Sequence, residues 1–552
     1  KKGDDVVKQN QMCVDRALAM LQEVAVPASL DGVAAFEAIE TITPEMGTFA
    51  NTLMKPILHQ KGDEIPVSAM SYDGSMPTAT SQYEKRGIAP SVPKWDSAKC
   101  IQCNQCVMAC PHAAIRSKLI APADLAGAPA SFETVDAKPP VKKELGLKFR
   151  MQVFIEDCTG CGVCVETCPA KEKALVMTHT PNERAAGQDA NVEFFLSLPD
   201  NVMGGTNATT VKGSQFLRPY FEFSGACAGC GETPYVKLVS QLFGNRMIVA
   251  NATGCSSIYG GSFPSLPYCK DKDGRGPAWA NSLFEDNAEY GFGMRLAVDT
   301  NRRQLMSCIE KIRELGVCCD DMKAALDYAV ENWKSTSDEA IANQEKLGEL
   351  LKVAVEKSEG EKREVYAKML ELKDYFVDKS VWILGGDGWA YDIGFGGLDH
   401  VVAQNRNVNI LVLDTEVYSN TGGQASKSTP IGAVGLVAGS GERVAKKEVG
   451  VMWMGDGNGV GAAGAMGANR QQALTAIREA EAHNGPSIIL AYAPCIAHGI
   501  NMTRSQTEAK RAVEAGYWPL YRYNPAEEQP FKWETKEATA SFQEFIRSEN
   551  RY

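Results

Sequence analysis

The sequence has no excess of basic residues and no long hydrophobic run. It carries 57 Lys and Arg against 68 Asp and Glu, a formal net charge of −11. An acidic chain repels phosphate backbones, so we expect no nucleic-acid partner. The longest apolar stretches have the length of a strand, as in Ile488–Tyr492, so we predict no membrane span. With 44% apolar and 23% charged residues, the 552-residue chain is not a disordered protein, a collagen or a coiled-coil rod.

Cysteine, in contrast, is abundant, with 17 residues in dense clusters. Large intracellular proteins rarely hold disulfides, so clustered cysteines indicate metal or redox chemistry. The first residues, Lys1–Asp5, contain no initiator Met and lead into no apolar signal-peptide region. We therefore interpret the chain as a processed protein or as part of a longer one.

The sequence pattern divides the chain into four regions. Residues 1–60 have helical periodicity, and residues 61–98 are a connector rich in Pro, Ser and Gly. Residues 99–190 are rich in cysteine. Residues 200–552 predict an α/β domain with a parallel sheet buried on both faces, interrupted by an amphipathic helical insertion at residues 299–379. The predicted strands are Met247–Ala250, Val381–Leu384, Val408–Leu413, Val451–Met454 and Ile488–Tyr492.

The motif Cys-x2-Cys-x2-Cys-x3-Cys-Pro occurs twice, at Cys100–Pro111 and Cys158–Pro169. This spacing is typical of bacterial ferredoxins, in which the fourth cysteine of each motif binds the other [4Fe-4S] cluster. Zinc instead favours two separated pairs of cysteines, so we favour clusters in a small α+β ferredoxin domain. The predicted ligands are Cys100, Cys103, Cys106 and Cys168 for the first cluster, and Cys158, Cys161, Cys164 and Cys110 for the second.

Two oxygen-rich turns follow predicted strands of the larger region. Gly385–Gly388 lets backbone N–H groups approach a diphosphate, and its Asp387 can bind a divalent ion that bridges the phosphates. The next predicted strand runs into residues 414–423, which supply further oxygen ligands. We predict a thiamine diphosphate site whose Mg²⁺ is bound by the Asp387 carboxylate, the Thr415 hydroxyl and the Val417 carbonyl.

A second Gly-Asp-Gly motif, Gly455–Gly457, competes with the first. It also follows a predicted strand, and Asn484 lies at a distance that thiamine motifs tolerate. Asn484, however, precedes the strand Ile488–Tyr492 and so belongs to the amino end of the sheet. Ligands of open α/β sheets bind at the carboxyl ends, which favours the first motif.

Four more cysteines lie at predicted strand ends or loops of the same region. Cys227 and Cys230 form a Cys-x2-Cys pair, and Cys255 and Cys495 each follow a predicted strand. Four thiols at one sheet edge would suit a third cluster beside the diphosphate. The spacing alone leaves zinc or free thiols open.

On these motifs the chain resembles the carboxy-terminal half of the pyruvate:ferredoxin (flavodoxin) oxidoreductases, in the 2-oxoacid:acceptor oxidoreductase family. The resemblance implies that Cys227, Cys230, Cys255 and Cys495 bind a third [4Fe-4S] cluster. It makes Asn420 and Cys255 the expected catalytic residues and residues 1–60 the helical tail of a preceding domain. The cofactor-binding residues that it implies are Glu232, Cys255, Gly386, Asp387, Gly388, Trp389, Thr415, Glu416, Val417, Tyr418, Ser419 and Asn420.

The resemblance also implies a reaction and partners. We expect oxidative decarboxylation of pyruvate with coenzyme A to acetyl-CoA and CO2, with electrons passing through three clusters to ferredoxin or flavodoxin. We expect a homodimer in the cytoplasm, or in the hydrogenosome of an anaerobic protist. An amino-terminal half or another subunit would supply the Glu that activates the thiamine. Three alternatives stay open: another 2-oxoacid as substrate, a fragment of a pyruvate:NADP oxidoreductase, and an electron-transfer iron–sulfur subunit without thiamine chemistry.

Overall fold

A computed structural model describes residues 4–23, 25, 42 and 46–552. The chain forms a small unit, residues 1–41, and a large unit, residues 42–552. In the small unit α1 (Asp4–Arg16) buries no side chain, and the apolar residues whose spacing underlies the helical prediction are exposed: Val14, Leu18, Met20 and Leu21. The rest of that prediction falls on η2 (Ala50–Met54), on α2 (Lys55–Leu58) and on residues outside the described part of the chain.

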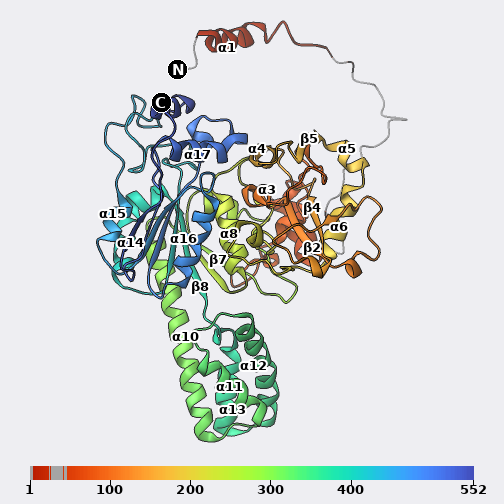
Figure 1. Ribbon diagram of the computed structural model, residues 1–552, viewed down its shortest axis with the longest axis vertical. Coiled ribbons are helices and arrows are strands. Elements are labelled where there is room, and N and C mark those ends of the chain that lie inside the picture. Colours follow the sequence, from red (N-terminus) through yellow and green to blue (C-terminus); the bar gives the residue numbers. More distant parts are fainter. Residues whose placement is uncertain (1–3, 24, 26–41, 43–45) are drawn as a thin grey trace. The chain divides into compact units, whose positions relative to one another are not determined.

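Two small antiparallel sheets carry the cysteine-rich region (Figure 1). β1 (Ser91–Trp95) pairs with β5 (Leu175–His179), and β4 lies between β2 and β3. β1 lies inside residues 61–98, so the predicted connector is wrong at its end, because this stretch is a paired strand and not an extended link. The other elements here are α3 (Gln105–Ala109), β2 (Ile115–Ile120), β3 (Val135–Asp136), β4 (Lys148–Val153), α4 (Val163–Thr167), α5 (Thr180–Ala185) and α6 (Gln188–Ser197).

An eight-stranded sheet forms the core of the rest of the large unit, in the order β13-β12-β10-β11-β9-β8-β6-β7. The six strands from β10 to β7 run parallel, which confirms the α/β prediction. β12 pairs antiparallel with β10 on one side and with β13 on the other. The strands are β6 (Met247–Ala252), β7 (Ala278–Ser282), β8 (Ser380–Gly386), β9 (Asn409–Asp414), β10 (Val460–Gly464), β11 (Ser487–Tyr492), β12 (Tyr521–Tyr523) and β13 (Phe531–Trp533).

Helices cover both faces of this sheet, and alternate residues of each strand face opposite ways. On β8, Trp382 and Leu384 belong to one buried cluster with α8 (Thr233–Phe243) and α16 (Arg470–Ala482). Ile383 belongs to the opposite cluster. That cluster includes residues of α10, α14 (Phe395–Ala403), α15 and α17 (Ser505–Glu514). Double coverage explains why these strands are nearly continuous apolar runs.

One predicted strand, Val451–Met454, is wrong. These residues lie in the helix α15 (Val449–Met454), which buries Val449 and Trp453 and exposes Val451 and Met452. A short apolar run has no period that separates strand from helix, and here the packed residues are four apart, as on a helix. The parallel strand is instead β10, whose sequence Val-Gly-Ala-Ala-Gly lacks the bulky residues that predict strands.

The helical insertion begins earlier than predicted. α10 (Asn287–Leu315) starts twelve residues before residue 299, because its first half packs Ala288 and Val298 against the sheet. Its second half packs against α11 (Asp320–Glu331), α12 (Asp338–Lys357) and α13 (Gly360–Glu371), as Figure 1 shows. In the described part of the chain, none of the helices has the length and apolarity that a bilayer crossing requires.

Candidate cofactor sites

The carboxyl ends of four neighbouring parallel strands bring the predicted site residues to one edge of the sheet. β6 leads into Cys255, β8 into Asp387, β9 into Thr415 and β11 into Cys495. In the sheet these strands follow one another in the order β11, β9, β8 and β6. Residues from distant parts of the sequence therefore meet where open α/β sheets bind ligands.

Three predicted magnesium ligands converge at this edge. The Thr415 hydroxyl lies 3.0 Å from Asp387 Oδ1 and 3.0 Å from the Val417 carbonyl oxygen. Asp387 also accepts a hydrogen bond from Ser426 Oγ, at 2.5 Å. Burial and the nearby charge of Asp414 raise the pKa of Asp387 well above its usual value. A buried carboxylate beside hydroxyl and carbonyl oxygens is a donor set that suits Mg²⁺.

A cleft opens beside these oxygens, with a volume of about 630 Å³ when the open solvent at its mouth is included. Eleven of the twelve predicted cofactor-binding residues line it, and Glu416 does not. Cys255 is among them, and its Sγ lies 3.2 Å from Ser419 Oγ. The others are Glu232, Gly386, Asp387, Gly388, Trp389, Thr415, Val417, Tyr418, Ser419 and Asn420.

Glu232 brings an unpaired buried carboxyl to the cleft. It directly precedes α8 and is buried, and its Oε2 has no hydrogen-bond partner. Burial raises the pKa of Glu232 to about 7. An orphaned buried oxygen is costly unless a ligand pairs with it, so Glu232 fits a residue that meets a bound cofactor.

Glu416 points elsewhere, and its placement in the cofactor-binding set is not supported by the geometry. Its carboxylate is buried and pairs with Lys446 at 3.0 Å and with Arg551 at 2.7 Å. It also accepts a hydrogen bond from Tyr517, at 2.6 Å. These cations lower the pKa of Glu416 to about 2, in spite of its burial. Glu416 thus belongs to an ion-pair network behind the cleft.

The competing Gly-Asp-Gly motif lies at the opposite edge of the sheet. Gly455–Gly457 precede β10 and Asn484 precedes β11, so both lie at the amino ends of parallel strands. His483 Nε2 contacts the Asn458 carbonyl, at 3.2 Å, which joins these two loops to each other. The sheet therefore separates this motif from the cleft.

The four predicted ligands of the second cluster line one cavity of about 360 Å³. Burial and the neighbouring Cys110 and Cys161 raise the pKa of Cys158 to about 12. The backbone N–H of Gly160 donates to Cys158 Sγ, at 3.4 Å, a contact that stabilises a thiolate. The cysteines around this cavity are Cys110, Cys158, Cys161 and Cys164, so the fourth thiol comes from the other motif, as the spacing predicts.

The predicted ligands of the first cluster are also neighbours. Burial, together with the charges of Cys100 and Cys168, raises the pKa of Cys103. Burial, together with Cys103 and the same two cysteines, raises the pKa of Cys106 well above its usual value. The Gln102 N–H donates to Cys100 Sγ, at 3.4 Å. Cys168 of the second motif therefore joins three thiols of the first.

The remaining four thiols, Cys227, Cys230, Cys255 and Cys495, lie near one another, and Cys255 lines the cleft. Burial and the charges of Glu232 and Cys227 raise the pKa of Cys495 to about 12. Burial, Glu232, Cys230 and Cys495 raise the pKa of Cys255 as well. Gly231 allows the loops to approach, since a Cβ there would lie 2.5 Å from the Pro494 carbonyl oxygen. Within the described part of the chain, no group of three or more Cys, His, Asp or Glu side chains lies close enough together to hold a single metal ion.

The structure adds residues that the sequence did not identify. Thr253 and Phe284 line the cleft, and Ser426 bonds Asp387. Thr253 follows β6 directly, so the rule that ligands bind at carboxyl ends would have found it. Ser426 lies in a long loop after β9, and no local pattern marks it.

Three models of protein families match the chain. Residues 99–172 match a 4Fe-4S dicluster domain, and residues 367–491 match the C-terminal TPP-binding domain of thiamine pyrophosphate enzymes. Residues 35–89 match a domain of unknown function, EKR. A dicluster domain joined to a thiamine-binding α/β domain defines an iron–sulfur oxidoreductase, with iron–sulfur clusters and thiamine diphosphate as its cofactors.

Curated relatives make the assignment more specific. The chain is 54% identical to pyruvate:ferredoxin oxidoreductase of Moorella thermoacetica, over 100% of its own length and 47% of the relative. It is 47% identical to a putative pyruvate-flavodoxin oxidoreductase of Synechocystis, over 100% and 46%. It is 44% identical to pyruvate dehydrogenase [NADP(+)] of Euglena gracilis, over 100% and 30%. The chain belongs to the pyruvate:ferredoxin (flavodoxin) oxidoreductase family, and it spans about half the length of its first relatives.

Proposed function

We propose that this chain is the thiamine-binding and electron-transfer part of an enzyme that oxidises pyruvate. Pyruvate and coenzyme A give acetyl-CoA, CO2 and a proton, and the electron pair leaves in single steps for ferredoxin or flavodoxin. The observation that carries the proposal is the meeting of Asp387, Cys255 and Cys495 at one sheet edge. An electron-transfer subunit without thiamine chemistry has no use for the cleft beside them.

The residues of the cleft divide into those that hold the cofactor and those that face its reactive part. Thiamine diphosphate, when bound, supplies the electron sink for decarboxylation. Asp387, Thr415 and the Val417 carbonyl bind the Mg²⁺ that holds the diphosphate. Asn420 and Cys255 line the same cleft and act as the catalytic residues.

Cys227, Cys230, Cys255 and Cys495 would hold a third [4Fe-4S] cluster, which would supply a one-electron acceptor next to the cleft. Two contacts tie this cysteine group to the second cluster. His112 Nε2 lies 2.9 Å from the carbonyl oxygen of Ala226, next to Cys227. The Thr503 hydroxyl donates to the Cys161 carbonyl, at 2.8 Å. These contacts favour a path in which the second cluster would follow the third and the first would come last.

The electron acceptor has two candidates. The Moorella and Synechocystis relatives are named for ferredoxin and flavodoxin, whereas the Euglena relative is named for NADP(+). We favour ferredoxin or flavodoxin, because the Moorella and Synechocystis relatives, which carry those names, are more similar to this chain than the Euglena relative is. The preference for pyruvate over another 2-oxoacid, the homodimer and the location in the cytoplasm or hydrogenosome stay predictions.

The test uses the complete purified protein. Three four-iron clusters require about twelve irons per chain, together with bound thiamine and magnesium. Pyruvate with coenzyme A should reduce ferredoxin or flavodoxin faster than NADP(+), and 2-oxoglutarate should be a poor substrate. About eight irons without thiamine would contradict the proposal, as would a preference for 2-oxoglutarate.

A further inference from the structure

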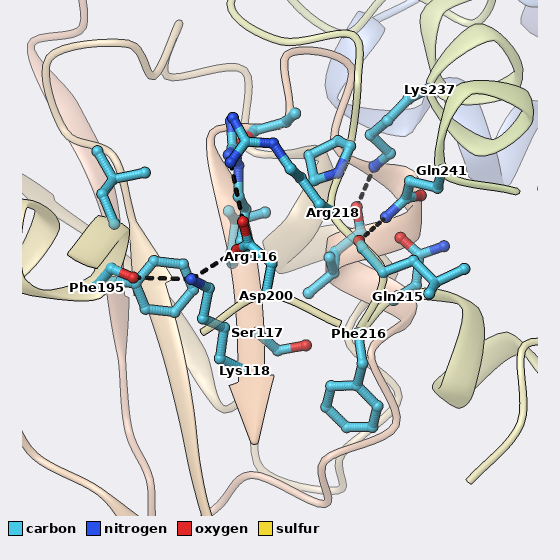
Figure 2. A pocket seen from close by; sticks show the side chains of 16 residues that line it. Arg116, Ser117, Lys118, Phe195, Asp200, Gln215, Phe216, Arg218, Lys237 and Gln241 are labelled. Carbon is cyan, nitrogen blue, oxygen red and sulfur yellow. Dashed lines mark hydrogen bonds and ion pairs between the residues drawn. The ribbon is translucent and has the colours of Figure 1, made fainter. Parts of the chain in front are cut away.

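A lysine of the thiamine-binding region is buried against the ferredoxin-like domain. Lys237 lies on α8 and is 1% exposed. Its Nζ donates to the carbonyls of Val107, Met108 and Cys110, the last two at 3.0 and 3.1 Å. Figure 2 shows Lys237 extending from its helix into a cavity that Val107 also lines. These carbonyls lie at the carboxyl end of α3, where the helix dipole favours a cation.

Lys237 has no carboxylate to balance its charge among the residues that the structure describes. Arg116 and Lys237 line one cavity (Figure 2), but Arg116 forms an ion pair with Glu222. Burial lowers the pKa of Lys237 to about 8, and Cys110 and Cys106 act against that shift. An isolated buried cation is strongly unfavourable. The natural counter-ion of Lys237 here is therefore a thiolate-bound iron–sulfur cluster. Cys110 belongs to the second cluster and Cys106 to the first.

Arg470 is a second cation in this region, and it is half-buried. It is the first residue of α16, and its Nε is buried without a hydrogen-bond partner. Burial lowers the pKa of Arg470, and Cys103 and Cys106, both in the ligand set of the first cluster, act against that shift. Like Lys237, it lies outside residues 99–172, which match the dicluster domain.

We propose that Lys237 and Arg470 set the reduction potentials of the ferredoxin-type clusters. Lys237 raises the potentials of both clusters, and Arg470 raises that of the first. A cluster gains one negative charge when it accepts an electron, so a buried cation nearby stabilises its reduced form. Arg470 makes the first cluster the more favourable site for the electron. The inference rests on the cluster assignments proposed above.

The experiment is a redox titration of the complete, iron-loaded protein, followed by electron paramagnetic resonance. Lys237→Met and Arg470→Met each remove one charge and keep much of the side-chain length. We expect Lys237→Met to move the midpoints of two clusters to more negative values, and Arg470→Met to move one. A tenfold change in the ratio of oxidised to reduced cluster corresponds to 59 mV for one electron, and we expect at least that shift.

Lys173→Met is the matched control. Lys173 Nζ also donates to the carbonyl of a cluster cysteine, Cys168, at 2.7 Å, but its side chain is exposed and screened by solvent. Its shift should be clearly smaller. Unchanged midpoints in Lys237→Met and Arg470→Met, with full iron content, would overturn this inference alone. If Lys237→Met does not fold, Arg470→Met decides, and a wild-type protein without the two clusters would overturn the cluster assignments themselves.

Discussion

Replacing Asp387 by Asn separates ligand binding from stability, because the two should change in opposite ways. The buried carboxylate accepts hydrogen bonds from the Thr415 hydroxyl and from Ser426 Oγ. Burial and the nearby charge of Asp414 raise its pKa, so the ionised form is unfavourable here without a cation. Asn keeps the shape and removes that charge. We therefore expect the free energy of unfolding of the ligand-free protein to stay equal or rise.

The affinity for thiamine diphosphate with Mg²⁺, in contrast, should decrease. A ligand at one hundred times its Kd stabilises a protein by about 2.7 kcal/mol. If Asp387→Asn weakens binding by at least about one hundredfold, the same concentration stabilises the variant by about 0.4 kcal/mol or less. The assay is thermal unfolding of the complete protein with and without thiamine diphosphate and Mg²⁺, together with the thiamine retained after gel filtration.

Asp456→Asn is the matched control, since Asp456 occupies the same Gly-Asp-Gly sequence at the opposite edge of the sheet. It should leave ligand stabilisation unchanged. The reasoning is refuted if Asp387→Asn keeps the stabilisation of the wild type, or if Asp456→Asn loses it.

Three further changes test other parts of the site. Cys495→Ala should lower the iron content from about twelve to about eight atoms per chain and leave thiamine binding intact; an unchanged iron content would contradict the third cluster. Burial raises the pKa of Glu232 to about 7, so the ligand-free folded protein holds a proton that the unfolded chain has lost, and stability should fall as pH rises toward 7. Glu232→Gln should flatten that fall in thermal unfolding, and an unchanged slope would refute it. Arg551→Met leaves Glu416 with one buried cation fewer and should lower the free energy of unfolding by about 3–5 kcal/mol in denaturant titration; a change below about 1 kcal/mol, typical of surface sites, would refute the burial argument.

Local spacing was enough to predict the cysteine clusters. Three ligands of each ferredoxin-type cluster lie within seven consecutive residues, as in Cys158–Cys164, and the chain can curl round a cubane only with such short gaps. The Gly-Asp-Gly turn after β8 was predictable for a related reason, because a diphosphate site needs a strand, a tight turn and a helix start in immediate succession. These features depend on neighbours in the sequence.

Sequence patterns were less informative where tertiary packing determines the conformation of a segment or the direction of a side chain. The run Val451–Met454 is apolar enough for a strand and became a helix, since only tertiary contacts select which of its residues are buried. Glu416 lies between two residues that line the cleft, yet its positive φ of 60° belongs to a backbone that turns its side chain toward Arg551. Neither outcome has a local signal.

By itself the sequence determined the chemistry: which thiols and oxygens are available, and that a parallel sheet carries them. Only the tertiary structure decided which of these groups lie next to one another. The order of strands places Cys255 and Cys495 beside Asp387, although more than 100 residues separate each from it along the chain. It also buries Lys237 at the end of a helix from another domain. Long-range contacts of this kind depend on how whole surfaces fit together, and no short stretch of sequence encodes that fit.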